Sequence, residues 1–153
     1  MTDAEGPAQL SDADLLARFK RSTNRPKSSD TLGFEIQALS QEGQWVEIAF
    51  DGKAEFANPL GVIQGGFLTA MLDEALSVAG QIASGMTHVM STLEMKTSYL
   101  RPARIGPLVA RGRVVRQGKQ VIFLEGEVRD GEGKVCATAT ATALPVEYKS
   151  RRR

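Results

Sequence analysis

A chain of 153 residues is long enough for one domain with a substantial hydrophobic core, since a chain of this size buries roughly two-thirds of its unfolded surface. Its 19 basic residues nearly balance its 18 acidic residues, and the only concentrated basic run is the KSRRR at the end of the chain. No broad basic face is therefore available to follow the phosphates of a nucleic acid. The absence of a signal-peptide pattern and of an apolar run near the roughly 18 residues that span a bilayer leads us to expect a soluble, cytoplasmic protein with no membrane partner.

The first 30 residues are expected to form an extension with one short helix. Ser11 or Asp12 can cap a helix in the segment SDADLLARFK, and the following RSTNRPKSSD is typical of a loop. The predicted divisions of the chain are an extension over residues 1–30, a main domain over residues 31–146 and a basic tail over residues 147–153.

A β-hairpin is predicted at the start of the main domain. In TLGFEIQALS the side chains of Leu32, Phe34, Ile36 and Ala38 alternate with other residues, and WVEIAF alternates again. The QEGQ between these segments supplies a turn. We therefore expect two adjacent antiparallel strands.

After Gly66 the apolar residues follow a helical period that continues to Gly85, where the helix is expected to stop. The apolar positions at spacings of three and four are Phe67, Ala70, Met71, Ala75, Val78, Ala79 and Ile82. A polar line at spacing four runs along the same helix through Thr69, Asp73, Ser77 and Gln81. This line is either a solvated face or a face turned toward a partner subunit.

Four further strands are predicted after the helix, in a meander. They are STLEMKTSYL, PLVARGRVV, QVIFLEGEV and KVCATATATAL, separated by segments with turn chemistry. The single cysteine, Cys136, cannot form an intramolecular disulfide, and the alternating small residues around it favour a packed strand position. The order of elements predicts an α+β domain in which a curved antiparallel sheet of five to six strands wraps one long helix.

The segment NPLGVIQGGFLTAMLDEA concentrates polar groups around the start of that helix. Asn58 is followed after five residues by Gln64, Gly65 and Gly66, and after six more by Asp73. This spacing resembles that of the hotdog-fold acyl-CoA thioesterases of the phenylacetic-acid-pathway and thioesterase-superfamily-member-2 type. In that family a histidine is commoner at the position of Gln64. STLEMKTSYLRPA and RQGK also resemble the family's strand with its proline turn and its basic turn, and the resemblance covers residues from about 30 to 145.

The resemblance implies a hotdog fold and hydrolysis of an acyl- or aryl-acyl-CoA to free acid and coenzyme A, with no metal and no bound cofactor. It also implies a homodimer that pairs into a tetramer. In the family, the carboxylate that matches Asp73 in one subunit faces the helix amino terminus of the other. The acyl-CoA is then the expected small-molecule partner.

The chemistry of the pattern agrees with this implication. The amino terminus of a helix offers free N–H groups and the positive end of the helix dipole, which can stabilise the oxyanion of a thioester under attack. Gly65 has no β-carbon, so a substrate carbonyl can approach the main chain, and Gly66 permits a tight entry into the helix. The alternative is that the Gly-Gly pair only eases a loop into a helix.

Asp73 is the candidate nucleophile or general base. Its neighbour Glu74 is a weaker candidate because it points about 100° away around the helix. Asn58 is expected to position water or the carbonyl, or only to shape a turn before Pro59. Gln64 can donate or accept a hydrogen bond but cannot transfer a proton near neutral pH.

Residues of the later strands complete the candidate set. Thr92 matches a hydroxyl residue that the resemblance places near the water of Asp73, and Ser91 is its adjacent substitute, although both fit ordinary strand positions. Tyr99, Arg101 and Arg116 are candidates for binding the coenzyme A nucleotide, because guanidinium groups bind phosphates and an aromatic ring stacks on adenine; for each Arg the alternative is a solvated surface position.

Two other classes of function are compatible with the sequence. The same pocket could hold acyl-CoA without turnover, as a binding module, with Gln64 marking lost catalysis. A hotdog dehydratase is disfavoured because its histidine would precede the helix, whereas the only histidine here is His88. We expect His88 to lie in a loop or at a strand edge, since no second His or Cys stands at metal-ligand spacing.

Overall fold

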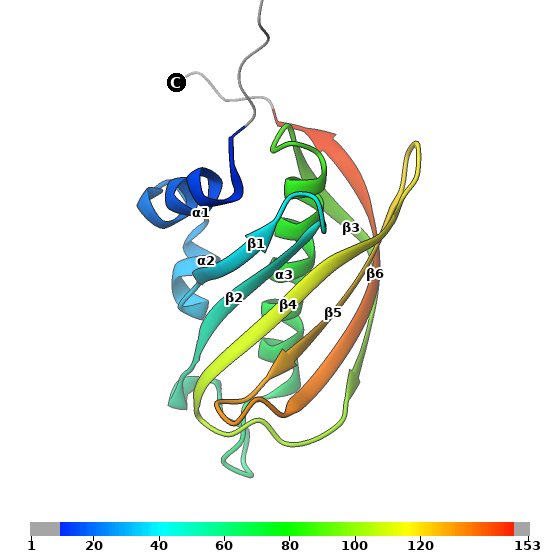
Figure 1. The fold of residues 1–153 in the computed structure, drawn as a ribbon. Helices are drawn as coiled ribbons and strands as arrows, with labels where there is room; N and C mark the ends of the chain where they lie inside the picture. Colours follow the sequence, from blue (N-terminus) through cyan, green and yellow to red (C-terminus); the bar gives the residue numbers. More distant parts are fainter. Residues whose placement is uncertain (1–9, 149–153) are drawn as a thin grey trace, which may run out of the picture.

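The computed structural model describes residues 10–148, in which one long helix is wrapped by a six-stranded antiparallel sheet (Figure 1). The helix is α3 (Gly65–Ala83). The strands are β1 (Glu35–Ser40), β2 (Trp45–Gly52), β3 (His88–Tyr99), β4 (Gly106–Gln117), β5 (Ile122–Arg129) and β6 (Val135–Glu147). The predicted α+β class and hotdog arrangement are confirmed. The predicted basic tail lies outside the described residues from position 149 onward.

The strand order is β1-β2-β4-β5-β6-β3, which corrects the predicted meander of the last four strands. Strands β4, β5 and β6 do form a meander, but β3 pairs with β6 and lies at the far edge of the sheet (Figure 1). The reason is that α3 carries the chain across the sheet after β2, so β3 starts at the opposite edge. The segment after β3 then returns to place β4 beside β2.

The amino-terminal part contains two helices where one was predicted. In α1 (Asp12–Arg21), Ser11 is the cap, because its Oγ accepts a hydrogen bond of 3.1 Å from the N–H of Asp14. The loop prediction is wrong over α2 (Lys27–Leu32), a single short helix whose carboxyl end is Gly33 in the left-handed conformation at φ 72°. Pro and Gly punctuation on both sides of α2 is typical of a loop, and the burial of its inward side chains is a tertiary effect. No helix within the described residues combines the length and apolar character that crossing a bilayer requires.

A β-bulge in β1 changes the predicted alternation of the first strand. The register shifts between Ile36 and Ala38, so the buried side chains are Ile36 and Leu39. Leu32 is buried in α2 and not in the strand. A bulge adds one residue to one strand and thereby moves later side chains to the other face.

Close packing of α3 against the sheet depends on a glycine in β4. A β-carbon at Gly112 would lie 2.4 Å from the carbonyl oxygen of Ala75. Ala75, Ala79 and Met71 are fully buried in this contact region. The small residues of α3 therefore let the sheet approach the helix backbone, which leaves the polar line of α3 beside the edge strand β3.

Ser29 on α2 anchors the amino-terminal part to α3. Its side chain is only 2% exposed, and its Oγ donates a hydrogen bond of 2.7 Å to Oε1 of Glu74. Burial raises the pKa of Glu74 above its usual value and the charge of Asp73 adds to this, while the hydrogen bond from Ser29 opposes it.

Replacing Ser29 with alanine should lower the free energy of unfolding by about 1 kcal/mol at pH 7, because a half-buried carboxylate loses its only hydrogen-bond donor from the described chain. Urea unfolding would measure this change. The matched control is Glu74→Gln, whose amide oxygen accepts the same hydrogen bond without burial of a charge.

The stability of the Glu74→Gln variant relative to the natural protein should depend on pH, because the pKa of Glu74 is raised in the folded protein. The folded protein holds the proton of Glu74 more tightly than the unfolded chain does, so this carboxyl group disfavours the folded state once the pH rises through its folded pKa. Glu74→Gln should therefore be at least as stable as the natural protein at pH 7, with the difference shrinking in acid. A loss in Glu74→Gln as large as that in Ser29→Ala would contradict this role.

Candidate active site

The first turn of α3 presents main-chain N–H groups at the positive end of the helix dipole. Gln64 is the cap residue, and its Oε1 accepts a hydrogen bond of 3.0 Å from the N–H of Gly66. The N–H of Gly65 has no acceptor among the described residues. This N–H group is thus available to bind the carbonyl oxygen of a substrate.

Tyr99 of β3 lies directly over Gly65. Its hydroxyl group donates a hydrogen bond of 3.0 Å to the carbonyl oxygen of Gly65 and lies 2.6 Å from Oγ1 of Thr69. A β-carbon at position 65 would lie 2.9 Å from Cζ of the Tyr99 ring. A larger residue at this position would therefore force the Tyr99 ring or the start of α3 to move.

Asp73 lies two turns farther along α3, beside the same edge strand. It is half-buried, and its Oδ1 accepts a hydrogen bond of 2.7 Å from Oγ1 of Thr92. The structure thus brings Thr92 and Asp73 together. Eight residues of helix separate Asp73 from Gly65, a rise of about 12 Å, so one substrate carbonyl cannot contact both groups of a single chain.

Glu74 lies on a different side of α3. Its carboxylate is bound to Ser29 of α2, whereas Asp73 faces β3. Of the two adjacent carboxylates, only Asp73 is therefore aligned with the polar line that includes Thr69.

Asn58 shapes the loop that leads into α3. Its Oδ1 accepts hydrogen bonds from the N–H groups of Leu60, at 2.9 Å, and Val62, at 3.4 Å. Its own N–H donates to the carbonyl oxygen of Val62 at 2.8 Å. The turn is held by the amide oxygen, and the amide nitrogen of Asn58 has no acceptor within residues 10–148.

Ser91 is next to Thr92 in β3, but consecutive strand residues point to opposite faces of a sheet. Thr92 is turned toward α3 and bonded to Asp73, so Ser91 points away from that carboxylate. His88 is the first residue of β3, with its Nδ1 2.8 Å from Oγ1 of Thr87, which confirms the predicted strand-edge position. In residues 10–148, no three His, Cys, Asp or Glu side chains are grouped closely enough to hold a metal ion.

Arg101 and Arg116 lie far apart within one chain. Arg116 of β4 lies opposite Phe123 of β5, and Phe123 lies opposite Thr142 of β6. Thr142 in turn lies opposite Glu94 of β3, so Arg116 and Glu94 are at the same level of the sheet. Arg101 is seven residues beyond Glu94, a separation of roughly 20 Å along the strand direction. The two arginines of one subunit therefore do not converge on one phosphate group.

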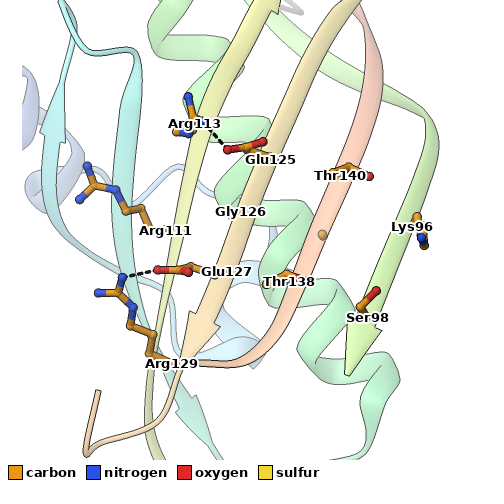
Figure 2. Close-up of a pocket in the computed structure, with 11 residues that line it drawn as sticks. Lys96, Ser98, Arg111, Arg113, Glu125, Gly126, Glu127, Arg129, Thr138 and Thr140 are labelled. Atoms are coloured by element: carbon orange, nitrogen blue, oxygen red, sulfur yellow. Dashed lines mark hydrogen bonds and ion pairs between the residues drawn. The ribbon is translucent and has the colours of Figure 1, made fainter. Parts of the chain in front are cut away.

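A cavity of about 520 Å³ lies on the side of the sheet away from α3 (Figure 2). Its lining residues are Lys96, Ser98, Arg111, Arg113, Glu125, Gly126, Glu127, Arg129, Thr138, Ala139 and Thr140. Ion pairs join Arg113 to Glu125 and Arg129 to Glu127. None of the candidate site residues lines this cavity, so it is separate from the site at α3.

Two contacts of the candidate residues and their neighbours are not predicted from the sequence. Thr97 lies 3.2 Å from Thr69, hydroxyl to hydroxyl, and Ser29 binds Glu74. Thr97 and Tyr99 are two residues apart in a strand and so share one face, which is a signal that could have linked them to the helix. Ser29 has no comparable signal, because the composition of its segment is typical of a loop.

Comparison with protein families gives an independent result. The family model described as "Thioesterase superfamily" matches residues 60–137 of the chain. The match contains the whole of α3 and β3, and with them Gly65, Asp73 and Thr92.

Individual relatives carry related names. A Saccharolobus solfataricus protein named "Putative esterase" is 36% identical over 106 residues, which is 69% of this chain and 74% of that protein. A crystal structure from Ralstonia eutropha JMP134, described as a "putative thioesterase, phenylacetic acid degradation-related protein", is 36% identical with a TM-score of 0.78, and the alignment covers 84% of this chain and 98% of that one. The PaaI protein from the phenylacetic acid degradation operon of E. coli is 19% identical with a TM-score of 0.73, covering 88% of this chain and 91% of that one, and this likeness shows the fold alone.

Proposed function

The chain belongs to the thioesterase superfamily, and we propose that it hydrolyses an acyl- or aryl-acyl-CoA to the free acid and coenzyme A. The observation that carries this proposal is the presence, on one helix, of the Gly65 N–H, which has no acceptor within residues 10–148, and of the Asp73 carboxylate, which accepts a hydrogen bond from Thr92. The name of the Ralstonia relative, which refers to phenylacetic acid degradation, supports an acyl-CoA substrate with an aromatic or apolar acyl group.

In the proposed reaction, the N–H of Gly65 donates a hydrogen bond to the carbonyl oxygen of the thioester. This donor and the helix dipole stabilise the negative charge that develops on that oxygen. Asp73 accepts a proton from water as the water oxygen bonds to the carbonyl carbon, or its carboxylate attacks the carbon itself. The C–S bond then breaks, and the thiolate of coenzyme A leaves and takes up a proton. If Asp73 attacks, water next hydrolyses the acyl-enzyme anhydride.

The distance of about 12 Å between Gly65 and Asp73 along α3 leads us to propose that the two groups of one site come from two subunits. The edge strand β3 supports this arrangement. It has 12 residues, pairs on one side with β6, and pairs with no strand of the described chain on the other side. A long unpaired edge is a template for pairing with a second copy. Asp73 lies beside this edge, where a second subunit can reach it.

The protein should be a dimer or a larger symmetric assembly at micromolar concentration, as measured by sedimentation velocity or light scattering. The variant Leu93→Lys tests whether the edge strand β3 pairs with a second subunit. Leu93 is 58% exposed at the bulge of β3, and a lysine at this position should weaken pairing between edges. Assembly and activity should then decrease together. A monomer with full activity would contradict the shared site.

The direct test of function is a panel of acyl-CoA and aryl-acyl-CoA substrates with detection of the free thiol. We expect release of coenzyme A from at least one member of the panel, and loss of that release in Asp73→Asn. Calorimetric binding of the same compounds with no thiol release would show that the protein is a binding module and would overturn the proposal.

A further inference from the structure

Tyr99 forms a chain of hydrogen bonds that links β3 to the first turn of α3. Its hydroxyl donates to the carbonyl oxygen of Gly65 at 3.0 Å and lies 2.6 Å from Oγ1 of Thr69. A phenol has one proton, so when that proton is donated to Gly65 the Thr69 hydroxyl is the donor to the Tyr99 oxygen. The hydroxyl of Thr97 lies 3.2 Å from that of Thr69 and is the alternative acceptor of the Thr69 proton, at a longer distance than Tyr99.

This contact restrains the start of α3, whose glycines have more backbone freedom than other residues. Two consecutive glycines open α3, and glycine loses more conformational freedom on folding than any other residue. The first turn of a helix also lacks main-chain acceptors for its N–H groups. A restraint from outside the helix therefore stabilises this Gly-Gly start more than it would a start made of other residues.

The restraint acts on the peptide groups themselves. The carbonyl of Gly65 and the N–H of Gly66 belong to one planar peptide unit. Tyr99 bonds to the oxygen at one end of this unit, and Gln64 Oε1 accepts from the N–H at the other end. The preceding peptide unit carries the N–H of Gly65, for which the described part of the chain offers no acceptor, and is joined to the fixed unit at a single Cα. Fixing one unit therefore narrows the directions in which the Gly65 N–H can point.

We propose that Tyr99 is a positioning residue, which orients the peptide groups at the start of α3 for the thioester carbonyl and acts together with Thr69. This inference rests on the proposed thioesterase function. It gives Tyr99 a role through its hydroxyl group that differs from stacking on the adenine of coenzyme A, which would use the aromatic ring alone.

The test compares Tyr99→Phe, which keeps the ring and removes the hydroxyl, with Thr69→Val and its conservative control Thr69→Ser. We expect Tyr99→Phe to lower kcat about 10-fold with little change in KM, the scale of one lost positioning hydrogen bond. Thr69→Val should lower kcat by a smaller factor, and Thr69→Ser should restore it. The double variant Tyr99→Phe/Thr69→Val should be no slower than Tyr99→Phe, because both residues act through the same hydroxyl group.

A truncated substrate separates positioning from nucleotide binding. With an S-acyl-N-acetylcysteamine thioester, which has no nucleotide, the loss in Tyr99→Phe should be the same as with the acyl-CoA. Three results in Tyr99→Phe would overturn the inference. They are a loss of activity confined to the acyl-CoA, a change in KM alone, and a kcat within twofold of that of the natural protein.

A second measurement does not depend on activity. In protein with 15N-labelled glycine, the Gly66 amide resonance should shift in Tyr99→Phe and should be unchanged in the control Thr92→Ser, which retains its hydroxyl and lies beside Asp73. An unshifted Gly66 resonance would overturn the positioning role. Absence of thiol release by the natural protein would instead count against the proposed function, and the resonance would still test the contact between Tyr99 and the helix.

Discussion

Replacing Asp73 with asparagine is expected to lower turnover by roughly 100-fold or more while the fold and the affinity for acyl-CoA are retained. Asparagine has nearly the same shape, and its amide oxygen can accept the hydrogen bond that Thr92 donates to Asp73. The amide can neither accept a proton from water nor attack the thioester carbonyl. Steady-state thiol release, together with calorimetric binding of a non-hydrolysable acyl-CoA thioether, would measure the two effects separately.

The control for this variant is Glu74→Gln, which changes the adjacent carboxylate. Glu74 is bound to Ser29 of α2 and is turned away from β3, so turnover should remain within a few-fold of that of the natural protein. Thr92→Val should have an intermediate effect, since it leaves the carboxylate of Asp73 in place but removes its hydrogen-bond donor. If Glu74→Gln lost most of the activity and Asp73→Asn little, the assignment of Asp73 would be wrong.

The sequence was sufficient to predict the elements that have strong local signals. The helical period after Gly66 predicts α3 to within two residues at its start, and alternation in the hairpin, together with strand-like runs divided by turn segments, predicts the six strands. The spacing of Asn58, Gly65 and Asp73 also identified the family that the comparisons show.

Other features depend on tertiary contacts that carry no local signal. The position of β3 beside β6 is set by where α3 crosses the sheet, and strand patterns do not specify which strands are neighbours. Helix α2 has six residues and is held by the burial of Ser29 and Leu32, which a composition of Lys, Ser and Asp does not predict.

The candidate site illustrates the same division. Asp73 and Thr92 were both proposed from the sequence, and the structure adds the direct hydrogen bond between them. In the sequence Tyr99 is a candidate because of its aromatic ring, whereas the structure shows its hydroxyl group bound to Gly65. A sequence pattern identifies which chemical groups are present, but the partner of a flexible side chain is decided by the packing of one element on another, which brings together residues as distant in the chain as Gly65 and Tyr99.

Replacing Gly65 with alanine should lower kcat roughly 100-fold, the scale of losing one oxyanion donor. The new β-carbon would lie 2.9 Å from Cζ and 3.2 Å from the hydroxyl oxygen of Tyr99, so either the ring or the first turn of α3 must move. The matched control is Gly66→Ala. Its β-carbon would lie 2.8 Å from Oε1 of the flexible Gln64 side chain, which would rotate and give up its hydrogen bond from the Gly66 N–H, while the contact of Tyr99 with Gly65 is retained. Gly66→Ala should therefore be the milder variant, and the reverse order of effects would contradict the role of Gly65.

The two inactive variants can also test whether the site is shared. In a mixed dimer of one Asp73→Asn subunit and one Gly65→Ala subunit, one site receives the intact Gly65 of the first chain and the intact Asp73 of the second. The other site carries both defects. Equal co-expression with random pairing should therefore restore about a quarter of the activity of the natural protein, because half of the dimers are mixed and each has one intact site. If each site were built from a single chain, mixing would restore nothing. Gly65 and Asp73 of one subunit would then have to act on the same thioester, although about 12 Å of rigid helix separates them.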